Sequence, residues 1–420
     1  MRERPRRAEP RRAHAIMRWP FRCSVTAQTR KGIALNFIKK AALPLAFAAG
    51  LLPLQAHAAD RAEAVSTAVD RAFRPLLDEY DIAGMAVAVT LDGQEYFVSY
   101  GTAERNKDVP VTKSTLFELG SLSKTFTATL GALAVAEGRM TLADRPSRFV
   151  PELADKPIDK ASLLELGTYT AGGLPLQFPD AISDDAKAIP YFGRWTPEAA
   201  PGAVRRYSNP SIGLFGHAAG LALGGGFKKE MESTLFPRLK LESSFVTVPP
   251  ARMKDYAWGT GKAGKPVRVN PGALDAEAYG IKSNAADMIR FIEANIDGGK
   301  LDPKTREAIQ NTQVGYFRTG PMVQGLGWEQ YSYPVSLDDL LSGNSTEMAT
   351  ESRKTVRLDP PRKPSGSTLF NKTGSTGGFG AYALFVPEKR VGIVMLANRN
   401  FPNAARVKAA YAVLKALAAE

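Results

Sequence analysis

Apolar and polar positions follow clear patterns near the two ends of the chain. Between residues 61 and 80, apolar side chains recur at helical spacing and predict an amphipathic helix: Val65, Val69, Phe73, Leu76 and Tyr80. Two β-rich runs follow at 84–90 and 94–100, and the Asp92-Gly93 pair between them predicts a hairpin. A matching pair of runs lies at 381–386 and 391–396, and a last helix carries Val407, Tyr411, Leu414 and Leu417 on one face.

The middle of the chain has helical patterns separated by loops. Residues 122–137 place Phe126, Leu130 and Leu133 on one stripe, which predicts a helix. Proline and glycine are scattered through 170–280, which indicates long loops inside one domain, and we expect a flexible surface excursion at 342–367. The predicted fold class is α+β: an antiparallel sheet built from both ends and flanked by terminal helices, with a mostly α-helical region from the middle, in a single domain at 59–420.

The formal net charge of +13 is concentrated at one end of the sequence. Residues 1–59 contain 12 Lys and Arg against 2 Asp and Glu, so the chain from Asp60 onward carries a net charge of only +3. The folded part is therefore nearly neutral, and we expect no nucleic-acid partner.

Residues 1–58 have the features of a leader and signal peptide. Basic residues precede an apolar run at 41–54, and Ala56-His57-Ala58 has the small-x-small form of a signal-peptidase site. The run is too short for a permanent membrane span, so we expect cleavage near Ala58, a periplasmic protein and no membrane attachment afterwards. Residues 1–30 add nothing that export needs, which indicates a misassigned start codon. The single cysteine, Cys23, lies in this leader, so the mature chain would have no disulfide.

The sharpest chemical signal is Ser121-Leu122-Ser123-Lys124, at the start of the predicted helix. A spacing of three places Ser121 and Lys124 on one helical face, where an amine can take the proton of a hydroxyl group. By itself this pattern is weak, because a serine before a helix is usually only an N-cap.

Two further motifs strengthen this signal. Tyr207-Ser208-Asn209 follows in the chain, and Lys372-Thr373-Gly374 leads directly into the glycine-rich run 375–380. Glycines at a strand edge allow a ligand to lie against the backbone, which would align a substrate amide.

Ser-x-x-Lys, Tyr-x-Asn and Lys-Thr-Gly in this order make the chain resemble the penicillin-recognising serine enzymes, specifically the class C serine β-lactamases. The resemblance covers essentially residues 60–420. It extends through Phe117-Glu118-Leu119-Gly120 and through the segments 169–177, 274–280 and 395–400. It implies a β-lactamase/transpeptidase-like fold, a hydrolase of β-lactam antibiotics that favours cephalosporins, a monomer, and no metal or other cofactor.

The resemblance also implies a role for each matching residue. Ser121 resembles the acylated nucleophile, and Lys124 and Tyr207 resemble the pair that moves its proton, near Lys372. The backbone N–H groups of Ser121 and Ser375 would form the oxyanion hole. Other residues would bind the substrate. Gln177 and Asn209 would hold its acylamino group, and its amide would lie against the backbone at Gly374. Its carboxylate would face Lys372, Thr373, Asn400, Asn403 and Arg406, and Tyr279 would form an aromatic wall of the pocket.

Several alternatives stay open at this point. The sequence does not decide whether Lys124 or Tyr207 is the general base. Asn400, Asn403 and Arg406 could simply cap the last helix, Gln177 and Asn209 could make ordinary loop hydrogen bonds, and Tyr279 could be a packing aromatic. A D-alanyl-D-alanine peptidase or esterase on the same scaffold, or a β-lactam sensor, would share the serine motif. His217 is the only histidine after the leader, which argues against a zinc enzyme.

Overall fold

The computed structural model describes residues 52–364 and 367–418, with side chains from Asp60 onward. The predicted leader and Cys23 lie outside these residues, apart from the last part of the leader, where helix α1 (Leu52–Glu79) begins. The chain from Leu54 onward forms one compact unit. No helix in the described part is long and apolar enough to cross a bilayer.

Within the described residues, nine strands form one antiparallel sheet in the order β12-β8-β9-β10-β13-β14-β15-β1-β2. Strands from the two ends of the chain meet toward one edge of the sheet, where β15 pairs with β1 and β2 is the edge strand. The strands are β1 (Gly84–Leu91), β2 (Gln94–Gly101), β8 (Gly315–Thr319), β9 (Met322–Gly325), β10 (Glu329–Ser332), β12 (Val356–Arg362), β13 (Thr368–Ser375), β14 (Gly380–Val386) and β15 (Val391–Ala397). The predicted α+β fold with a sheet from both chain ends is confirmed.

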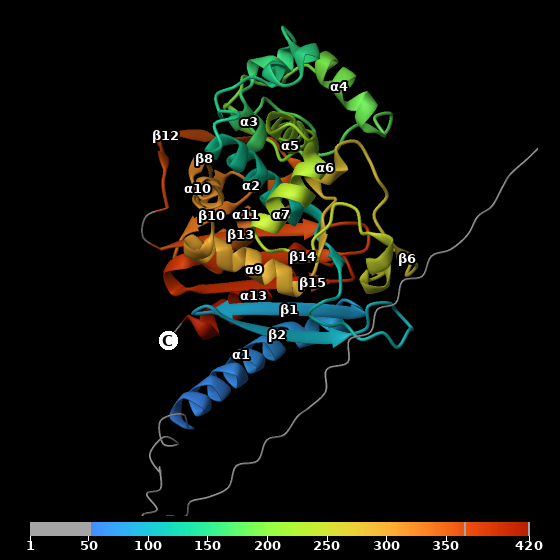
Figure 1. Ribbon diagram of the computed structural model, residues 1–420, viewed down its shortest axis with the longest axis vertical. Helices are drawn as coiled ribbons and strands as arrows, with labels where there is room; N and C mark the ends of the chain where they lie inside the picture. Colours follow the sequence, from blue (N-terminus) through green and yellow to red (C-terminus); the bar gives the residue numbers. More distant parts are fainter. Residues whose placement is uncertain (1–51, 365–366, 419–420) are drawn as a thin grey trace, which may run out of the picture. The chain divides into compact units, whose positions relative to one another are not determined.

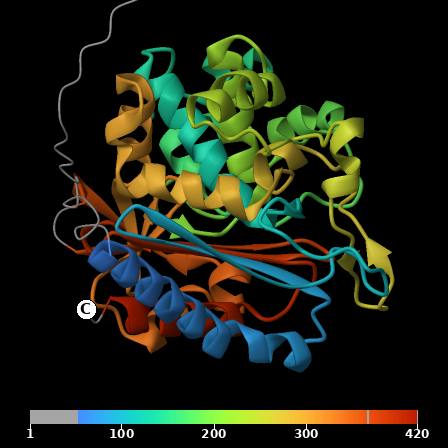
Figure 2. The same ribbon diagram turned by 60° about the horizontal axis from the view of Figure 1, so that its bottom comes forward.

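Helices cover both faces of this sheet. On one face, α1 and α13 (Asn403–Leu417) pack against the sheet through a core that includes Phe73 and Leu414. On the other face, α9 (Ala285–Ile296) lies across β15 and β1, as Figure 2 shows. Because both faces are covered, every side chain of β1 and β15 is buried, which explains why these strands read as nearly continuous apolar runs.

The helical region lies beyond α9 and has its own core (Figure 1). At its centre is α2 (Ser123–Ala136), which packs against α5 (Asn209–Leu223) and α10 (Pro303–Thr312). Its other helices are α3 (Leu163–Gly167), α4 (Asp185–Arg194), α6 (Phe227–Glu230), α7 (Phe236–Arg238) and α8 (Asp275–Ala278), and α11 (Leu337–Gly343) and α12 (Thr346–Thr350) lie near the sheet. Short strand pairs join β3 (Phe117–Glu118) to β7 (Lys282–Ser283), β4 (Val204–Arg205) to β11 (Arg353–Lys354), and β5 (Gly259–Thr260) to β6 (Pro266–Val267).

The expectation of a flexible excursion at 342–367 is wrong for most of that segment. Its described residues form the end of α11, the helix α12 and the strands β11 and β12. Strand β12 is at the edge of the sheet and most of its side chains are exposed, so it lacks the apolar alternation that would predict a strand. Pro360 and Pro361 are tolerated there because an edge strand leaves some N–H positions unpaired.

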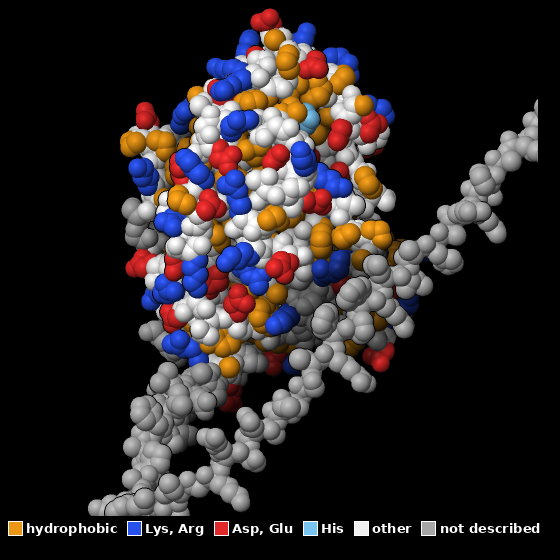
Figure 3. Space-filling view, viewed as in Figure 1, with side chains coloured by type: hydrophobic (Ala, Val, Ile, Leu, Met, Phe, Trp, Pro, Cys, Tyr) orange, Lys and Arg blue, Asp and Glu red, His pale blue; other side chains and the backbone are white. Residues whose placement is uncertain are grey.

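The surface agrees with a folded part that is nearly neutral. Figure 3 shows Lys and Arg side chains interspersed with Asp and Glu side chains over the face in view, without a large patch of one sign. This view gives no support to a polyanion-binding surface.

Candidate active site

Ser121 lies in a short 3-10 turn, Gly120–Leu122, that leads into α2. The residue at the N-cap position of α2 is Leu122, and no side chain caps the helix. Ser121 therefore does not serve as an ordinary N-cap, and its hydroxyl is available for another purpose.

Lys124 lies one helical turn after Ser121 and is fully buried. Its ammonium nitrogen lies 3.0 Å from Ser121 Oγ and donates a hydrogen bond of 2.6 Å to the carbonyl of Ala278, at the end of α8. Burial lowers the pKa of Lys124 to about 8, with a further contribution from Lys372. A neutral amine at this position can accept the hydroxyl proton.

Tyr207 is buried just ahead of α5, and its ring lies among cations. Lys124 Nζ lies 5.1 Å and Lys372 Nζ 4.9 Å from the centre of the ring. Burial raises the pKa of the phenol, but the two ammonium groups outweigh burial and lower the pKa below its usual value. The hydroxyl makes no hydrogen bond with any described residue, so it is free to exchange a proton with a ligand.

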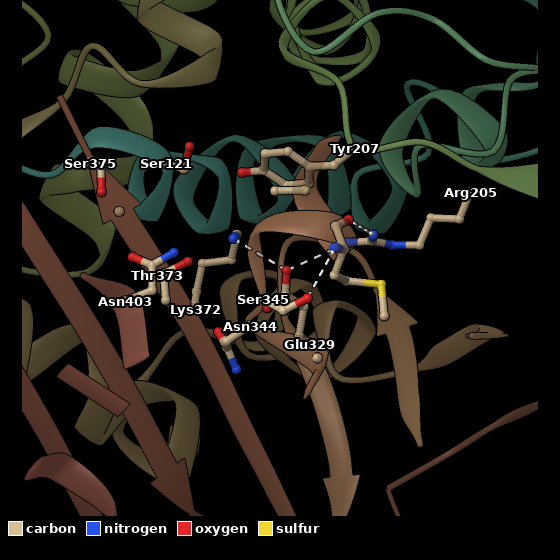
Figure 4. Close-up of a pocket in the computed structure, with 14 residues that line it drawn as sticks. Ser121, Arg205, Tyr207, Glu329, Asn344, Ser345, Lys372, Thr373, Ser375 and Asn403 are labelled. Carbon is tan, nitrogen blue, oxygen red and sulfur yellow. Dashed lines mark hydrogen bonds and ion pairs between the residues drawn. The ribbon is translucent and has the colours of Figure 1, made fainter. Parts of the chain in front are cut away.

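Lys372, on β13, is held by a carboxylate that sequence analysis missed. Glu329 Oε1 lies 3.3 Å from Lys372 Nζ and 3.6 Å from Arg205 Nη2 (Figure 4). Although burial opposes a charged amine, Glu329 raises the pKa of Lys372 above its usual value. Glu329 comes close to Lys372 because β10 pairs with β13, where Glu329 lies opposite Asn371, the residue before Lys372. No local pattern around Glu329 or Arg205 signals this long-range pairing.

The end of β13 lies directly against the turn that carries Ser121. Gly120 has a positive φ of 53°, and a Cβ atom there would lie 2.4 Å from Ser375 N. A Cβ atom on Gly374 would lie 2.0 Å from the carbonyl oxygen of Leu119. Two glycines thus allow the two backbones to touch beside Ser121 and Ser375.

A cavity joins these groups to the helices at the sheet edge. Figure 4 shows Ser121, Tyr207 and Lys372 facing one space from the start of α2, the segment before α5 and strand β13. Side chains of α11, α12 and the turn between them form another wall, which sequence analysis did not predict. The cavity is lined by Ser121, Arg205, Tyr207, Glu329, Gly343, Asn344, Ser345, Met348, Ala349, Lys372, Thr373, Gly374, Ser375 and Asn403.

The predicted amide-binding residues lie next to each other. Asn209 Nδ2 donates a hydrogen bond of 2.8 Å to Gln177 Oε1, while the buried Asn209 Oδ1 has no partner among the described residues. Gln177 is exposed, and Tyr279, just after α8, is partly buried against the helical core. These three residues lie outside the lining of the cavity described above.

The predicted carboxylate-binding residues near α13 separate into different environments. Asn403 lines the cavity, Asn400 is exposed, and Arg406 is fully buried. No side chain caps α13, whose N-cap residue is Pro402, so helix capping does not explain the asparagines.

The described residues contain no group of three His, Cys, Asp or Glu side chains that could hold a metal ion. What the site offers is a hydroxyl group beside a buried amine of low pKa, a phenol among cations, and a close approach of the β13 backbone to the turn that carries the hydroxyl. This set is suited to acyl transfer through a serine nucleophile.

Comparison with known proteins agrees with this class. The sequence profile of the Beta-lactamase family matches residues 69–418, and the chain belongs to that family. It is 52% identical to a beta-lactamase of Pseudomonas fluorescens over 83% of this chain and 98% of that protein. It is 46% identical to a beta-lactamase of Escherichia coli (strain K12) over 84% of this chain and 94% of that protein.

Solved structures give the same result for the fold. A class C beta lactamase superposes with a TM-score of 0.81 and 43% identity, covering 84% of this chain and 98% of that one. A "Beta-Lactamase/D-Alanine Carboxypeptidase" from Pseudomonas syringae superposes with a TM-score of 0.82 and 45% identity, covering 84% and 99%. The expected β-lactamase/transpeptidase-like fold and the resemblance to class C enzymes are confirmed.

Proposed function

We propose that this protein hydrolyses the amide bond of β-lactams through an acyl-enzyme on Ser121. The observation that carries the proposal is the 3.0 Å contact between Ser121 Oγ and Lys124 Nζ, a fully buried amine whose pKa is lowered to about 8. An amine of that pKa is partly neutral near pH 7 and can act as a general base.

In the first half of the reaction, neutral Lys124 takes the proton of Ser121, and Oγ attacks the carbonyl carbon of the β-lactam. The backbone N–H groups of Ser121 and Ser375 stabilise the oxyanion that forms. The carbon–nitrogen bond then breaks, and the nitrogen receives a proton from the Tyr207 hydroxyl, which is replenished from Lys124. Because Lys124 is the group in contact with Ser121, we assign it as the base for acylation.

In the second half, neutral Lys124 accepts a proton from a water molecule, directly or through the Tyr207 hydroxyl, and the water oxygen attacks the ester carbon. The bond between this carbon and Ser121 Oγ then breaks, and Oγ receives the proton back from Lys124. The remaining predicted residues would orient the substrate. Gln177 and Asn209 offer an amide pair to its acylamino group, and Tyr279 forms an outer wall. Lys372, Thr373, Asn400 and Asn403 face its carboxylate, and the edge at Gly374 aligns the reacting amide.

Nitrocefin hydrolysis by the chain that starts at Ala59 tests the proposal, with intact-mass spectrometry alongside. We expect rapid turnover that Ser121→Ala abolishes, and a transient mass increase on Ser121. Slow or absent turnover by the unsubstituted enzyme, with no adduct on Ser121, would refute the proposal. Comparing a chromogenic cephalosporin with a penicillin tests the expected preference for cephalosporins, and light scattering tests the expected monomer.

D-Ala carboxypeptidase activity is a second candidate, because a structural neighbour at 45% identity bears that name as well. A peptide ending in D-Ala-D-Ala distinguishes the two functions. Release of D-alanine together with a long-lived β-lactam adduct on Ser121 would favour the peptidase, whereas fast nitrocefin turnover favours the β-lactamase.

We also propose export to the periplasm, on the basis of the predicted leader at 1–58. N-terminal sequencing of the protein from a periplasmic extract should find a start at or near Ala59.

A further inference from the structure

Arg406 is a buried cation without a carboxylate partner. Its side chain is completely excluded from solvent, and it forms no ion pair with a described residue. Burial lowers its pKa to about 9, since the charged form loses its hydration. A buried charge of this kind is costly and needs a compensating role.

The guanidinium group is directed at the end of β13. Nη1 donates a hydrogen bond of 2.7 Å to the carbonyl of Gly374 and one of 3.0 Å to Ser375 Oγ. Nη2 donates to Asn400 Oδ1 at 2.7 Å and to the carbonyl of Phe401. All of these acceptors are uncharged, and the Phe401 ring, whose centre lies 4.8 Å from Cζ, supplies only a cation–π contact, so none of these partners carries a negative charge to neutralise the guanidinium.

The fold makes room for this guanidinium. A Cβ atom at Gly380, the first residue of β14, would lie 2.8 Å from Arg406 Cζ. Any residue other than glycine at position 380 would therefore displace the guanidinium from the Gly374 carbonyl. The space between Gly380 and the Gly374 carbonyl thus fits the planar guanidinium of Arg406.

The carbonyl that Arg406 binds belongs to the same peptide unit as the N–H of Ser375. In a trans peptide the C=O and N–H groups point in opposite directions along one conjugated unit. A cation on the oxygen draws electron density from the nitrogen, so the N–H becomes a stronger donor. The hydrogen bond from Arg406 to the Gly374 carbonyl also opposes rotation of this peptide, which would turn the Ser375 N–H away from the reacting carbonyl.

We propose that Arg406 is a positioning residue that strengthens the oxyanion hole through the Gly374–Ser375 peptide. This inference rests on the proposed function, in which the Ser375 N–H binds the oxyanion. It assigns to Arg406 a role other than binding the substrate carboxylate, for which Asn403 is placed on the cavity wall.

Binding of phenylboronic acid separates these two roles. Boron accepts the Ser121 oxygen while the serine proton passes to the base, and the product is a tetrahedral anion that needs the oxyanion hole but carries no carboxylate. We expect Arg406→Gln to weaken the binding of phenylboronic acid by roughly tenfold or more. The same variant should lower kcat for nitrocefin by a similar factor with little change in KM.

The matched control is Asn403→Ala, measured with phenylboronic acid and with a boronic acid that carries a carboxylate. This variant should weaken the binding of the carboxylate-bearing boronic acid only. If Arg406→Gln leaves the binding of phenylboronic acid unaffected, the inference is overturned. If it weakens only the binding of the carboxylate-bearing compound, Arg406 binds the carboxylate instead.

A second variant avoids substitution of a buried residue. Asn400 is exposed, so Asn400→Asp should fold while it places a carboxylate beside Nη2 and compensates the charge. We expect Asn400→Asp to weaken the binding of phenylboronic acid several-fold more than Asn400→Ala does. Equal effects of the two Asn400 variants would contradict the inference.

The proposed function can fail independently of these results. If the unsubstituted enzyme neither hydrolyses nitrocefin nor binds phenylboronic acid through Ser121, the proposed function fails and this inference falls with it. If it does both and Arg406→Gln binds phenylboronic acid equally well, only the inference about Arg406 fails.

Discussion

The carboxylate of Glu329 lies 3.3 Å from the ammonium group of Lys372, and both side chains are almost completely buried. The same oxygen lies 3.6 Å from Arg205 Nη2, so one carboxylate forms ion pairs with two cations. Arg205 is also bound to the pocket wall, because Nη1 donates a hydrogen bond of 3.0 Å to the carbonyl of Met348 in α12. These contacts connect the electrostatics around Tyr207 to the helices that line the cavity.

Glu329→Gln should move the pH dependence of acylation to lower pH. The charge of Glu329 raises the pKa of both Lys124 and Tyr207, so its removal lowers both pKa values. The free energy of unfolding should fall by about 3–5 kcal/mol, because two buried cations lose their partner. Single-turnover rates across pH and urea unfolding measure the two effects. Glu307→Gln, which removes an exposed ion pair with Lys304, should change neither.

Tyr207→Phe should retain the acidic limb of the pH profile of acylation, in which the rate rises with pH. If Lys124 takes the serine proton, the rate falls as pH drops below about 8, since the protonated amine cannot accept a proton. In Tyr207→Phe the rate should be lower by roughly 10²–10⁴ at every pH, yet it should still rise with pH. Loss of the pH dependence in this variant would identify Tyr207 as the base.

Gly120→Ala should lower kcat by roughly a hundredfold or more, because its methyl group would separate Ser375 N from the Ser121 turn. The matched control is Gly138→Ala. Gly138 also has a positive φ, 69°, but a Cβ atom there meets nothing within 4 Å. This control should lose about 1 kcal/mol of stability through backbone strain and keep its activity. Equal activity of the two variants would show that the close approach at Gly120 is not needed.

Thr376→Val should lower kcat more than Thr376→Ser does. Thr376 Oγ1 donates a hydrogen bond of 2.5 Å to Glu118 Oε2, which ties the residue after Ser375 to the strand before Ser121. Valine keeps the shape and removes the donor, whereas serine keeps the donor. We expect a loss of about tenfold for Thr376→Val and less than about threefold for Thr376→Ser, measured with nitrocefin. The reverse order would mean that the methyl group matters more than the hydrogen bond.

The sequence by itself determined the terminal helices, the two hairpins that lie side by side in the sheet and the helix after Ser121. These elements have strong local periodicity, since one stripe or face of each is buried. It also determined the pairing of Ser121 with Lys124, because helical spacing alone places residues three apart on one face. The order and identity of the three motifs predicted the family.

Only the tertiary structure decided how distant segments meet. Glu329 faces Lys372 because β10 and β13 pair, and Arg406 lies behind Gly374 because α13 packs under the sheet next to β14. Glu329 belongs to no local pattern in the sequence, and the family resemblance that singled out Arg406 gave no sign that its guanidinium would be buried against the Gly374 carbonyl. The segment at 342–367 shows the same limit. Strand β12 is held by backbone hydrogen bonds to β8, and most of its side chains are exposed. Because neither face of the strand is buried, its sequence has no alternation of apolar and polar residues that would predict a strand.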